Sequence, residues 1–213
     1  MLVDLLDRLR CPVLHDDSWL VATALVTRHR HIVEGSLGCP VCGAEYSIRE
    51  GVVWFGGNEL PPEDGPVDRT GPGEAMRLAA LLALNERGVF LLGGAWGALA
   101  GELATLMPLQ LLLVSPPAGA HGSVVRGTGD SMPFASGSLA GIAIDRASGP
   151  LAEAAARTLI SRGRLLAPAD TPIPAPIVLV ARDTRHWVGE CSASPVVSTL
   201  VNPRRAAPRN AHQ

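Results

Sequence analysis

Apolar runs broken by glycines and polar residues dominate the middle and the C-terminal part of the chain. The run Val89–Leu92 leads into the glycine-rich stretch Gly93–Ala98, and this order predicts a buried strand, a tight turn and the first turn of a helix. Later runs predict further strands of the same sheet at Leu111–Val114, from Val124, and at Gly141–Ile144, Arg164–Leu166, Ile177–Ala181 and Val196–Val201. The pattern is typical of a doubly wound α/β sheet, whose ligands sit at the carboxyl ends of the strands.

Two helices are predicted beside these strands. Glu74–Arg87 has a broad apolar face, and Leu151–Ser161 is followed by Gly163 as a stop signal. Parallel strands need a crossover of about a dozen residues or more, and Ser115–Gly122 is shorter than that. We therefore expect no helix between Pro116 and Gly122, and an α/β domain that lacks the usual crossover helix at this point.

The N-terminal part has a different pattern. A short helix is predicted over Asp4–Arg10, followed by a hairpin of Trp19–Val26 with Arg30–Val33 and a second hairpin in Ala44–Trp54 that turns at Glu50-Gly51. The segment 57–73 is a linker by its glycines and prolines. These signals predict a small β-rich domain at 1–56, an α/β domain at 74–201 and a disordered basic tail at 202–213.

Four side chains near the predicted hairpins are candidate metal ligands. Cys11, Cys39 and Cys42 are three soft donors, and His15 is placed to reach back across one turn as the fourth. A tetrahedral zinc site takes such a set. One alternative is that His15 is a solvated loop residue and the site is lost. A redox role for Cys39-Pro40-Val41-Cys42 is less favoured, because the pair does not open a helix after a strand.

The same region resembles a known family. The stretches Leu9-Arg10-Cys11-Pro12, Cys39–Cys42 and Tyr46–Val52 are similar to the small zinc-ribbon family that activates tRNA methyltransferases. Leu14 stands where that family usually has its second cysteine. The resemblance implies a zinc ribbon, and it suggests an activator that docks on a separate methyltransferase by adding a strand to its sheet.

The larger part resembles class I S-adenosylmethionine-dependent methyltransferases. The most specific segment is Asp130–Leu139, supported by Glu153–Leu159, Gly163–Leu166 and Ala181–Val188. The resemblance implies a reduced, doubly wound, Rossmann-like methyltransferase sheet behind the small zinc-ribbon-like domain.

The residues that the resemblance would assign to the cofactor differ from the family pattern. Leu91 stands for the acid at the end of the first strand, Leu113 (or Ser115, with a slip) for the acid that binds the ribose, and Thr128 for a third acid. Ala95 replaces the middle glycine and Trp96 adds bulk. Gly93, Gly94, Gly97 and Asp130 are the vestigial cofactor-binding candidates. We therefore predict that S-adenosylmethionine does not bind, and assign no catalytic residue among the scattered His121, His186, Asp145 and Asp183.

Composition narrows the function classes further. Apolar content is 47% and the net charge is −2, which predicts a folded chain without a general attraction to nucleic acid. Acidic residues near the start argue against a secretion signal, and the cysteine pair favours a reducing, cytoplasmic setting. Gly88–Val114 carries one charge, Glu102, but its glycines and Pro108 fit strand–helix–strand better than a membrane span.

These observations favour a non-catalytic, methyltransferase-like chain that acts as a binding or scaffold subunit in a larger protein complex. Two alternatives stay open: a methyltransferase with an atypical cofactor site, and an activator of a separate methyltransferase.

Overall fold

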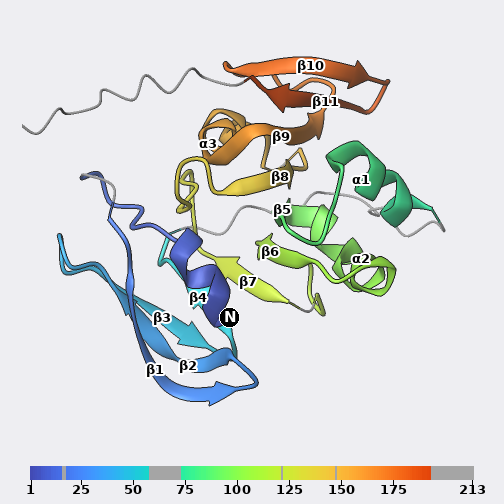
Figure 1. Cartoon of the computed structure of the whole chain (residues 1–213). Coiled ribbons are helices and arrows are strands. Elements are labelled where there is room, and N and C mark those ends of the chain that lie inside the picture. Colours follow the sequence, from blue (N-terminus) through green and yellow to red (C-terminus); the bar gives the residue numbers. More distant parts are fainter. Residues whose placement is uncertain (16–17, 58–72, 121, 147, 193–213) are drawn as a thin grey trace, which may run out of the picture.

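The computed structural model describes residues 1–15, 18–57, 73–120, 122–146 and 148–192. Its described strands form one eleven-stranded sheet in the order β1-β2-β3-β4-β7-β6-β5-β8-β9-β11-β10 (Figure 1). The strands are β1 Val21–Arg28, β2 His31–Gly38, β3 Glu45–Arg49, β4 Val52–Trp54, β5 Val89–Gly93, β6 Gln110–Val114, β7 Ser123–Arg126, β8 Leu139–Ala143, β9 Leu159–Pro168, β10 Ile177–Arg182 and β11 His186–Cys191.

The N-terminal ribbon consists of two antiparallel hairpins, β1–β2 and β3–β4, with β2 paired to β3. The second hairpin turns at Glu50 and Gly51, as the sequence predicts, and both residues have positive φ, 52° and 79°. Two consecutive residues with positive φ make the tight hairpin turn that matches strand twist. The predicted first hairpin is also confirmed, although its strands extend further, to Arg28 and Gly38.

The ribbon joins the α/β sheet through a parallel pair of strands. Val52, Val53 and Trp54 of β4 pair with Val124, Val125 and Arg126 of β7, and we call this junction the seam. Just beyond β4, Phe55 N–H donates to Arg126 O at 3.0 Å. A second junction lies before the ribbon, where Arg10 N–H donates to Pro133 O at 2.8 Å. The two parts therefore share one continuous sheet.

The α/β part has the strand order of a doubly wound sheet, the architecture that the sequence predicts. Counted from β5 along the chain, its seven strands lie in the order third, second, first, fourth, fifth, seventh, sixth, with β5 to β9 parallel and β11 antiparallel to β9. The winding reverses between β5 and β8. This position is the topological switch point. Open α/β sheets bind their ligands there, outside the carboxyl ends of the strands.

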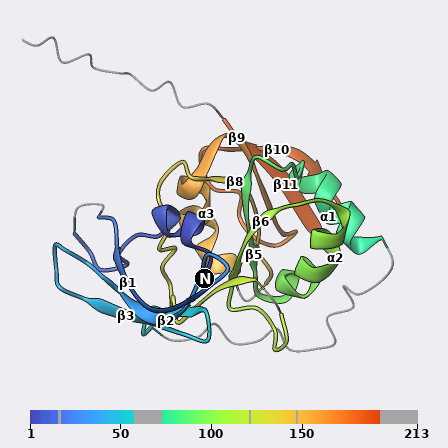
Figure 2. The ribbon, with the colours of Figure 1, turned by 60° about the horizontal axis from the view of Figure 1, so that its bottom comes forward.

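Short helices cover the two faces of the sheet, and Figure 2 shows them on opposite sides. Leu78 of α1 (Glu74–Leu82) and Leu103 of α2 (Ala100–Leu106) belong to one apolar core. Ala155 of α3 (Ala152–Thr158) and Leu5 of the 3-10 helix η1 (Val3–Arg8) belong to the core of the other face. Two further 3-10 helices are η2 (Gly94–Leu99) and η3 (Gly149–Leu151).

Several predicted boundaries need correction. The first chain segment is a 3-10 helix ending at Arg8. Helix α1 ends at Leu82 because Ala83 adopts φ 51° and Asn85 Oδ1 accepts the N–H groups of Arg87 and Gly88. Helix α3 ends at Thr158, because the following residue Leu159 already pairs with Leu139 in the sheet.

The closing strands differ most from the prediction. The predicted strand Val196–Val201 lies outside the described residues, as does most of the predicted linker. The strand β11, which the sequence reading missed, inserts between β9 and β10. No helix occurs among the described residues between Pro116 and Gly122, as predicted.

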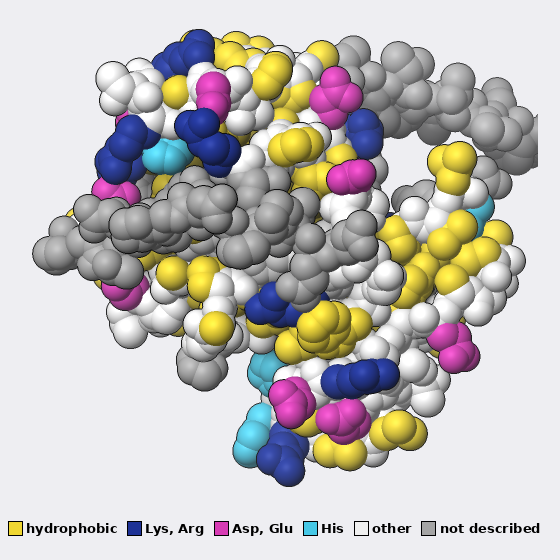
Figure 3. All heavy atoms as spheres, turned by 180° about the vertical axis from the view of Figure 1, so that it is seen from behind, with side chains coloured by type: hydrophobic (Ala, Val, Ile, Leu, Met, Phe, Trp, Pro, Cys, Tyr) yellow, Lys and Arg dark blue, Asp and Glu magenta, His cyan; other side chains and the backbone are white. Residues whose placement is uncertain are grey.

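The face of the molecule seen in Figure 3 carries several kinds of side chain. In Figure 3, acidic, basic and hydrophobic side chains are interspersed over the face that is visible. Among the described residues, no helix combines the length and the apolar character needed to cross a membrane.

Candidate functional site

The four predicted metal ligands meet at the tip of the ribbon. Cys11 follows the N-terminal 3-10 helix, and Cys39 and Cys42 flank the turn after β2. This turn is closed by Gly43 N–H, which donates to Cys39 O at 2.9 Å, and Gly43 has φ 73°. The ligand atoms of Cys11, His15, Cys39 and Cys42 all lie within 4.8 Å of one another. Two ligand pairs, which we call knuckles, therefore converge as the sequence predicts: Cys11 with His15, and Cys39 with Cys42.

The distances within this cluster fit a tetrahedral zinc ion. The sulfurs of Cys11 and Cys42 are 3.7 Å apart, and Cys39 Sγ lies 3.4 Å from His15 Nε2. Zinc binds sulfur at about 2.3 Å and imidazole nitrogen at about 2.0–2.1 Å, so a tetrahedral site places two sulfurs about 3.8 Å apart and a sulfur and a nitrogen about 3.6 Å apart. A three-cysteine, one-histidine donor set of this size fits zinc, with His15 in place of the missing cysteine.

The surroundings of the cysteines differ. Burial raises the pKa of Cys39, but backbone N–H groups of Cys42 and Val41 and the neighbouring thiols outweigh it and lower the pKa to about 6. Burial raises the pKa of the Cys11 thiol, against hydrogen bonds from Tyr46 and the Val13 backbone. Burial, followed by the Cys11 contact, also raises the pKa of Tyr46. Of Cys39 and Cys11, Cys39 therefore more readily forms the thiolate that metals bind.

The predicted cofactor residue Asp130 lies beside this centre. It is exposed, and it lines a hollow of about 480 Å³ together with Cys11, His15, Met132 and Arg157. None of the three candidate glycines lines this hollow. The structure therefore brings Asp130 towards the ribbon, whereas Gly93, Gly94 and Gly97 lie together at the turn after β5.

That glycine turn is occupied by a carboxylate from the same chain. Asp145, two residues beyond β8, is 1% exposed. Its Oδ2 accepts the N–H of Ala95 at 2.8 Å, and its Oδ1 accepts the N–H of Ser148 at 2.9 Å. Gly94 has φ 57°, and a Cβ built on it would collide with the Asp145 carboxylate. The Asp145 carboxylate therefore fills the space beside Gly94.

Other side chains fill the remaining space around the turn. A Cβ at Gly97 would lie 2.6 Å from Pro116 Cβ. Trp96 is 1% exposed, and its Nε1 donates to Ile144 O at 3.1 Å. The bulky residue that the sequence reading places in the cofactor's way is thus fixed in the core by a hydrogen bond at the switch point.

The positions that would carry cofactor-binding acids are apolar and internal. Leu91 and Leu113 are both 0% exposed, and each packs into a different core of the sheet. Beyond β6, Pro116 O accepts a hydrogen bond from Arg126 Nη2 at 2.8 Å. Leucines at these two positions serve packing, and the next loop is tied to β7.

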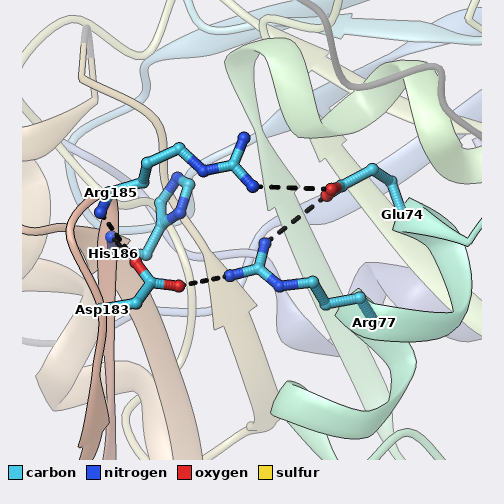
Figure 4. Close-up of polar contacts among 5 residues, drawn as sticks. All are labelled: Glu74, Arg77, Asp183, Arg185 and His186. Atoms are coloured by element: carbon cyan, nitrogen blue, oxygen red, sulfur yellow. Dashed lines mark hydrogen bonds and ion pairs between the residues drawn. The ribbon is translucent and has the colours of Figure 1, made fainter.

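A charged cluster at the same end of the sheet was not predicted. Arg77 of α1 lies 2.6 Å from Asp183 Oδ2 and 3.5 Å from Glu74, and Arg185 lies 3.7 Å from Glu74 (Figure 4). The other oxygen of Asp183 accepts the N–H groups of Arg185 and His186, each at 2.7 Å.

This cluster ties α1 to the turn between β10 and β11. The His186 ring lies 5.3 Å from the Trp96 ring, so the cluster adjoins the filled turn. The sequence signal for this cluster was the polar stretch Asp183–His186 between two apolar runs. This stretch does not indicate that its ion-pair partners lie on α1. Cys191, an isolated cysteine in the sequence, is buried in the core.

One comparison with known proteins concerns the ribbon. Residues 3–51 match the family model of Trm112p-like proteins. This match confirms the predicted resemblance of the ribbon. No curated protein matches the chain.

Several of the solved structures that resemble the chain are methyltransferases. TrmN from Thermus thermophilus has a TM-score of 0.45 at 14% identity, covering 59% of this chain and 51% of that one. A 1,6-didemethyltoxoflavin-N1-methyltransferase from Burkholderia thailandensis has a TM-score of 0.39 at 13% identity, covering 56% and 76%.

A third similar structure is a geranyl diphosphate C-methyltransferase from Streptomyces coelicolor, with a TM-score of 0.37 at 14% identity, covering 52% and 56%. The chain spans about half the length or less of the first solved structures it matches, 50% and 43%. The chain combines an N-terminal region that matches the Trm112p-like family model with a doubly wound, Rossmann-like α/β sheet, as its own strand order shows.

Proposed function

We propose that this protein is a non-catalytic, methyltransferase-like binding or scaffold subunit whose cofactor site has become part of its own core. One observation carries the proposal: the Asp145 carboxylate occupies the glycine turn at the switch point. It accepts the Ala95 N–H of the turn and the Ser148 N–H of its own loop, so the turn donor is already satisfied and the carboxylate is held from both sides. A ligand would have to displace a buried, hydrogen-bonded carboxylate before it could approach this turn.

The missing acids support the same reading. A cofactor ribose facing Leu113 would lack charge-assisted hydrogen bonds, which are worth about 1.5–3 kcal/mol each. The same holds for the amino group that would face Leu91. Two lost contacts lower affinity by about two to four orders of magnitude. The rival function, a methyltransferase with an atypical site, requires another arrangement of donors around the same ligand.

We propose that the ribbon packs on the α/β part of its own chain and does not activate a separate methyltransferase. In the activator alternative, the ribbon would add a strand to the sheet of a separate methyltransferase. Here β4 already adds to β7 of the same chain. Because this edge of β4 is paired within the chain, a separate methyltransferase would need another surface of the ribbon. The partner of the proposed subunit is another protein, and its site of action is proposed to be cytoplasmic.

We further infer that Cys11, His15, Cys39 and Cys42 hold zinc. When bound, the ion would supply a tetrahedral cross-link between the two knuckles and no chemistry on a substrate. Its ligands are two residues of the segment after η1 and two residues of the turn after β2. The ion would thereby fix the ribbon in the shape that presents β4 to β7.

Calorimetric titration of the purified chain tests the non-catalytic assignment. S-adenosylmethionine and its demethylated product should each give no binding isotherm below the millimolar range. Elemental analysis of the same sample, purified without chelator, should find about one zinc per chain. A low-micromolar dissociation constant for either nucleoside ligand would favour the methyltransferase alternative, whatever the zinc content.

A further inference from the structure

Tyr46 connects the candidate metal centre to the rest of the ribbon. It is the chain's single tyrosine, lies on β3 and is 6% exposed. Its hydroxyl oxygen is 3.2 Å from Cys11 Sγ. A buried phenol hydroxyl needs a hydrogen-bond partner, and a metal-bound thiolate is an acceptor. With metal bound, the Tyr46 hydroxyl would therefore be the donor and the Cys11 sulfur the acceptor of this hydrogen bond.

Cys11 is the ligand that most needs such support. Cys39 and Cys42 share one tight turn that is closed by backbone hydrogen bonds. Cys11 instead belongs to the knuckle that lacks a second cysteine, in which Leu14 at the usual cysteine position is fully exposed. Partners that hydrogen-bond to ligand atoms orient those ligands and tune the metal.

We propose that Tyr46 is the positioning residue of the metal centre: its hydroxyl donates to the Cys11 thiolate, and its ring links that ligand to the seam. The proposal rests on the proposed zinc site. The ring centroid of Tyr46 lies 4.8 Å from that of Phe55, with a 50° tilt. Phe55 is also the residue whose N–H donates to Arg126 O beside β7. One side chain thus contacts both the metal ligand and the residue at the junction of the two parts.

Cobalt substitution tests this role with Tyr46→Phe, which removes the hydroxyl and keeps the ring against Phe55. Losing the hydrogen bond returns electron density to the Cys11 sulfur. The sulfur-to-cobalt charge-transfer band should therefore move to lower energy than in the wild-type chain. Zinc affinity, measured by chelator competition, should fall by about 10–100-fold. Ser47→Ala is the matched control, because it deletes a hydroxyl from the next residue of the same strand and should change neither value.

Three results would overturn the proposal. The first is a Tyr46→Phe chain that binds cobalt and zinc as the wild type does, with the same spectrum. The second is an equal change in Ser47→Ala. The third is a wild-type chain that binds neither metal, which would also refute the zinc site proposed above. Circular dichroism of the chains at saturating zinc checks that Tyr46→Phe has not altered the fold itself.

Discussion

The ribbon tip and the glycine turn lie on the same sheet, and they differ in how their sequence pattern relates to their structure. At the tip, the ligand pattern in the sequence is irregular, yet His15 and three cysteines converge within 4.8 Å. At the turn, the backbone retains the glycine-rich strand-to-helix shape, yet Asp145, Pro116 and Trp96 occupy the space around it. Four metal ligands can converge although one of them lies one residue along the chain from the usual position. A glycine-rich turn, by contrast, can form without leaving space for a ligand.

The physical reason lies in what each site requires. A metal needs four donors at the corners of a tetrahedron, and a flexible loop can supply one of them from a neighbouring position. A nucleoside cofactor needs empty space and unpaired donors at one edge of the sheet. Once an internal carboxylate satisfies those donors, reopening the space costs the hydrogen bonds that filled it.

Removal of the metal should have the largest effect and should fall on the ribbon alone. Structural zinc sites in small peptides contribute apparent free energies of about 10–16 kcal/mol. We expect chelation, or Cys39→Ser, to abolish amide protection in β1 to β3 in hydrogen exchange, while β5, β6 and β8 stay protected. Cys191→Ser is the control cysteine, since Cys191 lies outside the cluster. Equal protection of β1 to β3 with and without metal would remove the contrast between the two sites.

Restoring one acid should not restore the cofactor site. Leu113→Asp places a charge at a position that is 0% exposed. An uncompensated buried charge costs about 3–5 kcal/mol, so the free energy of unfolding in urea should fall by that amount. Calorimetry should still detect no S-adenosylmethionine binding. Gln110→Asp, at the exposed start of the same strand, should be nearly neutral. Micromolar binding by Leu113→Asp would mean that the turn is not blocked.

Removal of the carboxylate at the turn should have an effect on stability comparable with that of Leu113→Asp. Asp145→Ala leaves the N–H groups of Ala95 and Ser148 without their acceptor. Each buried unsatisfied donor costs about 1–3 kcal/mol, so urea unfolding should register a loss of about 2–6 kcal/mol for the two. The exposed Asp130→Ala should stay within about 0.5 kcal/mol of the wild type. Equal stability of the two variants would show that Asp145 does not hold the turn.

The charged cluster beside the turn should have the smallest effect, and it should depend on pH. Backbone N–H from His186, followed by that from Arg185 and the charge of Arg77, lowers the pKa of Asp183 despite some desolvation. Its contribution is therefore complete above the unfolded-state pKa, which is about 3.9, and is lost as pH falls through the lower folded value.

Because the Asp183 side chain is 48% exposed, solvent screening limits this contribution to about 1 kcal/mol or less. Asp183→Asn should lower the free energy of unfolding by that amount at pH 7, and the difference from the wild type should shrink towards pH 3. Asp4→Asn, in an exposed pair with Arg30, is the comparison variant. A difference that grows on acidification would contradict the assigned sign.

The sequence predicted what depends on local pattern. The hairpin turn at Glu50-Gly51, the parallel strands from Val89 onward and the four metal candidates follow from periodicity, turn residues and donor type. The absence of a helix among the described residues after Pro116 follows from chain length alone.

The rest depends on contacts between distant residues. Asp145 lies fifty residues from Ala95, and nothing in its local sequence marks it as the group that fills the turn. The pairing of β4 with β7 joins segments that the sequence reading assigns to separate domains. The strand β11 was missed because its mixed pattern, His186–Cys191, becomes a strand only between β9 and β10.

The most direct test of the filled turn is a crystal structure of the chain grown with millimolar S-adenosylhomocysteine. We predict that Asp145 Oδ2 stays within hydrogen-bonding distance of Ala95 N–H and that no ligand density appears between Gly93 and Gly97. A nucleoside bound at that turn, with the Asp145 side chain swung away, would contradict it.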